Sequence, residues 1–154
     1  MPAFELTAAT FKEGEFIPTQ HTCEGEDRSP PLCWSHPPTG TRCFVLIADD
    51  PNAPGGTWVH WVLFNIPIDV RGLAEGLPQQ DVLPNDAHQG LNDFHRVGYG
   101  GPCPPPGKPH RYYFKMYALD RELPLKPKAT KAQVVEAMKG HVLGEAQLMG
   151  LYRR

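Results

Sequence analysis

The chain has 154 residues, of which 40% are hydrophobic and 21% charged, and its formal net charge is −2 at pH 7. These values exclude a disordered chain, and the absence of a basic surplus gives no reason to expect a nucleic-acid partner. A chain of this length suits one domain, so residues 1–154 are expected to fold as a single unit. No stretch approaches the roughly 20 apolar residues of a membrane span, and the first residues do not resemble a signal peptide, which predicts a cytoplasmic protein.

Most of the predicted elements are strands. Weak strands are expected near Phe4–Thr7 and Leu32–His36. Residues 43–48 form a continuous apolar run of strand length, which is typical of a strand buried on both faces. Thr57–Ile66 is rich in aromatic and β-branched residues, and Tyr112–Leu119 alternates along its length, so both segments are predicted to be strands.

Helix is predicted only near the C-terminal end of the chain. Thr130 and Gln133 have the spacing of a capping box, and apolar residues follow at helical spacing as far as Met149. Gly140 lies where one helix would end and a second begin, and a weak strand is expected at Gly150–Tyr152. Strands first and helices last predict a mainly β domain, in which a two-sheet β-sandwich with C-terminal helices buries the aromatic strands.

A rigid loop precedes the strand that contains Tyr112. Residues 101–107 hold four prolines and two glycines, so this loop loses little entropy when it is held in one shape. His110, Arg111 and Tyr112 stand at the junction of loop and strand. Such an arrangement is suited to a pre-organised pocket rim, although a plain hairpin connection would also explain it.

A second stiff loop begins with two carboxylates. Asp49 and Asp50 directly follow the apolar run 43–48, and the next six residues include two prolines and two glycines. An Asp-Pro pair favours the start of a turn, so the simplest interpretation is an aspartate that caps its own turn. The alternative is a carboxylate presented to a ligand at the sheet edge.

His60 lies within an apolar strand. Strict alternation places it on the same face as Val62 and on the opposite face from Trp61. A histidine in such a strand is most often a satisfied core residue, but a buried imidazole requires a polar partner. Asp50 and His110 are the candidate partners.

Three chemistries are open to these residues. The imidazoles of His60 and His110 and the hydroxyl of Tyr112 can donate hydrogen bonds to an oxyanion, with Asp50 orienting one imidazole. A metal site of two histidines and one carboxylate is a weaker hypothesis, because no pair has short ligand spacing. Hydrolysis with Cys103 or a serine as nucleophile is weaker still, because no nucleophile motif is present. The sequence therefore predicts neither a metal nor a cofactor.

The remaining cysteines and histidines are predicted to be structural. No Cys-x-x-Cys pair and no zinc-finger spacing occurs, which predicts free thiols in a cytoplasmic protein, while a Cys33–Cys43 bridge stays open. The cysteines are Cys23, Cys33, Cys43 and Cys103, and the histidines predicted to face solvent are His21, His36, His88, His95 and His141.

Taken together, these motifs resemble the phosphatidylethanolamine-binding protein family, in its bacterial and archaeal Raf-kinase-inhibitor-like branch. Asp49–Pro54 is similar to the family's Asp-Pro-Asp-Ala-Pro motif, and Trp58–Trp61 to its strand histidine. Gly98–Tyr112 resembles its Gly-x-x-Gly-Pro-x-Pro-Pro…His-Arg-Tyr block. Ile17–Trp34 and His141–Arg153 are similar to the opening and the end of the bacterial branch, so the resemblance covers nearly the whole chain.

The resemblance implies a sandwich of a large and a small sheet with Greek-key connections and C-terminal helices. It also implies a small cavity for phosphate, a phospholipid headgroup or a nucleotide phosphate. Family members are binding and regulatory proteins without an accepted metal or turnover, and prokaryotic members are often homodimers. Carried over by position, the ligand-binding residues are Asp50, Ala53, Trp58, His60, Pro102, His110 and Tyr112.

This chain departs from the family pattern at three places. Asn52 replaces the second aspartate of the motif, and His21 stands where tyrosine is commoner. Thr57 follows Gly-Gly directly, so the eukaryotic insertion is absent and kinase inhibition is not carried over. The leading hypothesis is a non-catalytic, regulatory binding protein for small anions. The alternatives are a small hydrolase or isomerase that uses the same pocket, or a protein–protein regulator such as a kinase inhibitor.

Overall fold

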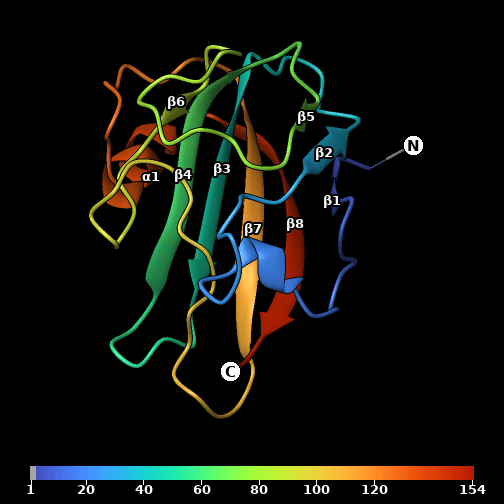
Figure 1. Ribbon diagram of the computed structural model, residues 1–154. Helices are drawn as coiled ribbons and strands as arrows, with labels where there is room; N and C mark the ends of the chain where they lie inside the picture. The colour runs from blue at the N-terminus through green and yellow to red at the C-terminus, as the bar shows by residue number, and fades with distance from the viewer. Residues whose placement is uncertain (1–2) are drawn as a thin grey trace.

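The computed structural model describes residues 3–154 of the chain, which form two antiparallel sheets and one α-helix (Figure 1). The small sheet has the order β1-β2-β5 and the large sheet has the order β6-β4-β3-β7-β8. The elements are β1 (Glu5–Ala8), a 3₁₀ turn η1 (Thr19–His21), β2 (Leu32–Ser35), β3 (Cys43–Asp50), β4 (Trp58–Pro67), β5 (Gly72–Leu73), β6 (His88–Gln89), β7 (His110–Leu119), α1 (Lys131–Met138) and β8 (Val142–Tyr152).

The large sheet contains a Greek key. Strands β3, β4 and β6 follow one another across the sheet, and β7 then returns to pair with β3 on its other side. This gives the spatial order 4-1-2-3 that defines the motif. The return brings the start of β7 next to the end of β3, two places that lie about sixty residues apart in the sequence.

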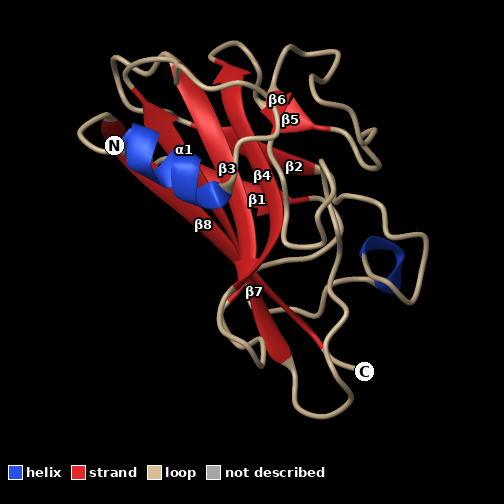
Figure 2. Cartoon of the chain, turned by 90° about the vertical axis from the view of Figure 1, so that its left-hand side faces the viewer, coloured by secondary structure: helices blue, strands red, loops and turns tan. Residues whose placement is uncertain are grey.

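Apolar side chains cover both faces of β3. One core lies between the two sheets and includes Trp34, Phe44, Trp61 and Phe114. A second core lies between the large sheet and α1, and Figure 2 shows the helix on the side of the sheet away from β1, β2 and β5. All eight residues of β3 are buried, as the continuous apolar run predicts. The mainly β, two-sheet sandwich is therefore confirmed.

The prediction of a second C-terminal helix is wrong. The first helix exists and begins with the expected capping box, in which Thr130 accepts from the backbone N–H of Gln133 and the Gln133 side chain accepts from that of Thr130. After Gly140, whose φ is +80°, the chain continues as β8 and pairs with β7 along its length. The spacing of the apolar residues in this segment fits the period of a helix as well as that of a strand. The segment is a strand because it pairs with the open edge of β7.

The prediction of strict alternation around His60 is also wrong. Ala48 pairs with Trp61 and Asp49 pairs with Val59, so His60 is an extra residue, a β-bulge. As a result Val59 and Val62 both lie in the core beneath α1, whereas Trp61 lies in the core between the sheets. The bulge turns the His60 side chain away from Val62 and toward Tyr112 at the start of β7.

Within residues 3–154, the structure holds no helix with the length and apolar character needed to cross a membrane. His21, predicted to face solvent, is instead fully buried, because its ring bonds the hydroxyl of Thr10 at 2.8 Å and the carbonyl of Arg28 at 2.9 Å. It anchors the turn η1, which leads to Cys23.

Candidate functional site

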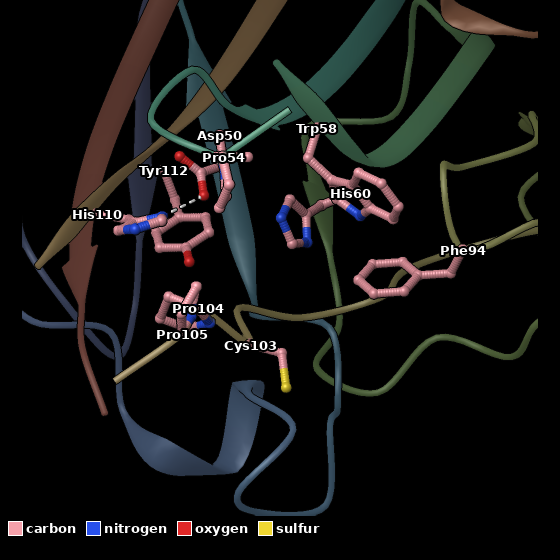
Figure 3. Close-up of a pocket in the computed structure, with 11 residues that line it drawn as sticks. Asp50, Pro54, Trp58, His60, Phe94, Cys103, Pro104, Pro105, His110 and Tyr112 are labelled. Atoms are coloured by element: carbon pink, nitrogen blue, oxygen red, sulfur yellow. Dashed lines mark hydrogen bonds and ion pairs between the residues drawn. The ribbon is translucent and has the colours of Figure 1, made fainter. Parts of the chain in front are cut away.

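A small cavity of about 180 Å³ opens where β3 ends and where β4 and β7 begin (Figure 3). Six of the seven predicted ligand-binding residues line it, and the seventh, Pro102, lies just outside, where its carbonyl accepts from the backbone N–H of Cys23. The predicted residues in the lining are Asp50, Ala53, Trp58, His60, His110 and Tyr112, and those not predicted are Pro54, Phe94, Cys103, Pro104 and Pro105.

Asp50 orients His110. Oδ2 of the buried Asp50 lies 2.7 Å from Nδ1 of His110, and Oδ1 accepts the backbone N–H of Asn52 at 2.7 Å. A carboxylate only accepts hydrogen bonds, so Nδ1 of His110 carries a proton and donates it. Asn52 in turn accepts the backbone N–H of Arg111 at 3.0 Å. The loop after β3 is thereby fixed to the start of β7.

The partner of His60 is neither of the two predicted residues. Its Nδ1 lies 2.6 Å from the carbonyl oxygen of Gly100, and the N–H of Gly100 donates back to the carbonyl of His60. Burial lowers the pKa of His60 against the opposing effects of the Gly100 carbonyl and nearby carboxylates, which favours a neutral ring. A Cβ on Gly100 would stand 2.5 Å from the ring of Phe94, so only glycine allows this close approach.

Tyr112 lies between the two imidazoles. Its ring stacks on His110 with centroids 6.4 Å apart and meets His60 edge-on at 5.3 Å. Burial, together with the Asp50 carboxylate, raises the pKa of Tyr112, which keeps its hydroxyl protonated and able to donate. The Nε2 atom of neither histidine has a hydrogen-bond partner among residues 3–154, and neither atom is sealed from solvent.

Aromatic side chains form the wall opposite Tyr112 and His110. Trp58, which is 39% exposed, meets Phe94 edge-on with centroids 5.5 Å apart. The guanidinium of Arg96 lies over the Phe94 ring, 5.5 Å from its centroid. Asn92 positions this wall, because its side chain accepts from two backbone N–H groups of its own turn and donates to the carbonyl of Gly98. The sequence indicates a turn with an anchoring Phe94 but not its role in the pocket.

A disulfide fixes the proline loop that closes the pocket. Cys23 and Cys103 are joined across 80 residues of sequence, so the prediction of free thiols is wrong for these two. Cys33 is free and exposed, while Cys43 is free and buried, and burial raises the pKa of its thiol to about 12. The Gly101 N–H also donates to Asp27 at 2.8 Å, which ties the loop to the same N-terminal segment.

No group of three or more histidine, cysteine, aspartate or glutamate side chains that would hold a metal ion occurs in the described part of the chain, residues 3–154. The available chemistry is therefore that of one paired imidazole, one neutral imidazole and one phenol hydroxyl in a largely apolar cup.

Comparison with known proteins shows which family the chain belongs to. Residues 7–153 match the sequence model described as phosphatidylethanolamine-binding protein. The chain belongs to the phosphatidylethanolamine-binding protein family. Proteins of this family are in general non-catalytic binding proteins, and membership supports a ligand-binding, regulatory role for this chain.

Relatives from several organisms match nearly the whole chain. A UPF0098 protein of Methanothermobacter thermautotrophicus is 52% identical over 97% of this chain and 98% of its own length. A UPF0098 protein of Aquifex aeolicus is 49% identical over 97% of this chain and 88% of its own length.

Solved structures of the family share the fold. The phosphatidylethanolamine-binding protein homologue CT736 of Chlamydia trachomatis is 41% identical, with a TM-score of 0.91 over 100% of this chain and 99% of that one. YbcL of Escherichia coli, described as a member of the mammalian family, is 37% identical, with a TM-score of 0.92 over 99% of each chain.

Proposed function

We propose that the pocket binds a small phosphate-like anion and that the protein is a regulatory binding protein rather than an enzyme. The observation that carries the proposal is the Asp50–His110 pair, which holds the His110 ring in the cavity lining against Tyr112 and leaves its Nε2 without a partner among residues 3–154 (Figure 3). When His110 is protonated, this Nε2 and the Tyr112 hydroxyl supply two donors to one oxyanion.

The surroundings support anion binding of a particular size. A volume of about 180 Å³ accommodates a phosphate group with a small substituent, and the proline and aromatic walls suit an organic remainder. Inorganic phosphate, a phosphorylethanolamine headgroup and a nucleotide phosphate share this chemistry. The titration described below distinguishes among them.

The hydrolase and isomerase hypotheses find less support. Cys103, the predicted thiol nucleophile, is held in the disulfide and has no thiolate to offer. Nε2 of His60 and of His110 are each left without a nucleophile partner among residues 3–154. Kinase inhibition is not proposed, since Thr57 follows directly on the Gly-Gly turn before β4.

Homodimer formation and a cytoplasmic location are part of the proposal as secondary expectations. The Cys23–Cys103 disulfide counts against the location, because cytosolic disulfides are rare outside hyperthermophiles. Sedimentation of the purified protein tests the dimer, and the thiol count described in the Discussion, made on protein taken directly from the cell, tests the location.

Calorimetric titration tests the main proposal. Phosphate, phosphorylethanolamine and adenosine monophosphate are titrated at about pH 6 into the wild type, His110→Ala and His141→Ala. His141 is a matched control, because its Nδ1 bonds the Asp120 carboxylate at 2.8 Å and it does not line the pocket. Binding by the wild type and the control, with at least tenfold loss in His110→Ala, is expected. Equal binding by all three proteins, or none, would overturn the proposal.

A further inference from the structure

The two histidines of the pocket have their Nδ1 atoms fixed by different acceptors. Nδ1 of His110 faces a carboxylate at 2.7 Å, and Nδ1 of His60 faces the carbonyl oxygen of Gly100 at 2.6 Å. Neither acceptor can donate, so both rings carry hydrogen on Nδ1. In a neutral ring so arranged, Nε2 is a lone pair that accepts a hydrogen bond.

His60 keeps this lone pair in the pocket. The ring is only 5% exposed, and it lies among Phe94, Tyr112 and the backbone of Gly100, where a positive charge is poorly solvated. Nε2 has no partner within residues 3–154 and stays open to the cavity. A ligand that fills the cavity therefore has to offer a donor to His60 or leave this acceptor without a bond.

The carboxylate of Asp50 adds a second constraint. It is buried in the lining of the same cavity, and His110 neutralises at most one negative charge. Asp50 and a protonated His110 cancel each other, and the lining holds no second cation. A monoanion therefore leaves one uncompensated negative charge in the cavity, whereas an oxyanion with two negative charges leaves two, which is more costly. The rim arginine, Arg96, lies over Phe94, outside the lining.

We propose that the pocket selects oxyanions that carry their own hydroxyl group, such as the monoanion of phosphate or of a phosphonate. The ligand's P–OH donates to Nε2 of His60, and its anionic oxygens accept from Tyr112 and from Nε2 of protonated His110. This inference rests on the proposed function and names the protonation state of its ligand. His60 is the residue that determines the specificity.

A matched pair of ligands tests the inference. At about pH 6, methylphosphonate and methanesulfonate both carry a single negative charge and have nearly the same shape, but only methylphosphonate carries a hydroxyl. A missing hydrogen bond to a buried acceptor weakens binding by roughly ten- to a hundredfold. We therefore expect the wild type to bind methylphosphonate at least tenfold more tightly than methanesulfonate, with inorganic phosphate titrated in parallel.

The variant His60→Gln tests which residue is responsible. A glutamine amide can donate as well as accept, so methanesulfonate is expected to gain affinity and the ratio between the two ligands to fall toward one. His141→Gln, at the surface pair with Asp120, should keep the wild-type ratio. A wild-type ratio in folded His60→Gln would overturn the inference.

The nitrogen resonances of His60 in the wild-type protein give a test that needs no variant. We expect protonated Nδ1 and unprotonated Nε2 in the free protein, and a shift of the Nε2 signal when phosphate binds. Protonated Nε2 in the free protein at about pH 6 would overturn the inference. Binding of phosphate and of both methyl ligands with equal affinity would also overturn it while leaving the proposed function intact, and no binding of any of the three would overturn both.

Discussion

Oδ2 of Asp50 and Nδ1 of His110 lie 2.7 Å apart, although the two residues are 60 positions apart in the chain. Both side chains are nearly buried, at 5% and 13% exposed, and the carboxylate also holds the backbone of Asn52. The pair is thus both a link between β3 and β7 and the device that orients an imidazole in the pocket. It can be tested in both capacities.

Asp50→Ala should weaken the fold and the site together. It leaves Nδ1 of His110 and the Asn52 N–H without their acceptor, which predicts a loss of about 2 kcal/mol in the free energy of unfolding and about tenfold in phosphate affinity. Asp120→Ala breaks the exposed pair with His141 and should cost less than about 1 kcal/mol. Urea denaturation and calorimetry measure the two effects, and equal losses in both variants would contradict this assignment.

Phosphate binding should strengthen as the pH falls from about 8 to about 5.5. A His110 ring with hydrogen on both nitrogens has one more donor and a positive charge, whereas burial lowers the pKa of His60 and disfavours a charge on that ring. His110→Asn should abolish most of the pH dependence. The phosphate affinities of the wild type and of His110→Asn should be measured at four pH values. A wild-type affinity that does not change with pH would count against the role of His110.

The stability of the protein should decline with acid partly through His60. Its pKa in the folded protein lies below the ordinary value of 6.5, so the unfolded chain binds the proton more readily and stability is lost as the pH falls through 6.5. The contribution of one such group is up to about 1.4 kcal/mol per pH unit. His60→Gln should flatten the dependence by that slope just below about pH 6.5, as measured by urea denaturation. An unchanged slope would show that other groups are responsible.

Thiol titration under denaturing, non-reducing conditions should detect two cysteines, Cys33 and Cys43, rather than four. Cross-linking residues that are 80 positions apart restricts the unfolded chain, so Cys103→Ser should reduce stability by about 2–5 kcal/mol. Cys33→Ser, at an exposed free thiol, is the matched control and should change little. Four reactive thiols in protein prepared without reductant would refute the bridge.

Gly101→Ala should be strongly destabilising. A Cβ there would stand 2.1 Å from the carbonyl oxygen of His21, which accepts from the Tyr99 hydroxyl, and 2.4 Å from the Asp27 carboxylate, which accepts from the Gly101 N–H. The expected loss is about 3 kcal/mol or more. Gly55→Ala in the loop before β4 meets nothing within 4 Å and serves as the control in thermal unfolding. Similar melting temperatures for the two variants would contradict the packing described here.

Local patterns are sufficient to predict three strands of the large sheet, β3, β4 and β7, and the first helix. The apolar run at 43–48 and the capping box at Thr130 carry their signal within a few residues, and the structure has both. The prediction of helix for residues 142–149 is wrong, because their apolar spacing fits a helix as well as a strand and only the open edge of β7 decides between them, whereas the strand expected at Gly150–Tyr152 is confirmed. Pairing between distant segments is not encoded in local periodicity.

The pocket could be predicted as a set of residues but not as a network. The motifs brought Asp50, His60 and His110 together, yet the partner of His60 is a backbone carbonyl, which no side-chain pattern can indicate. Phe94 was not predicted as part of the pocket because its position depends on the turn formed by Asn92. Backbone partners and loop conformations follow from the finished fold.

Because of the bulge at His60, the face on which each side chain of β4 lies depends on the number of residues in the strand. Val59 and Val62 must stay beneath α1 while Trp61 stays between the sheets, and one extra residue allows all three. Deleting a single residue between Trp58 and Trp61 would remove this bulge and, in doing so, withdraw the imidazole from the cavity. A copy of this pocket in another β-sandwich would need the same number of residues between Trp58 and Trp61 before the identity of any residue could matter.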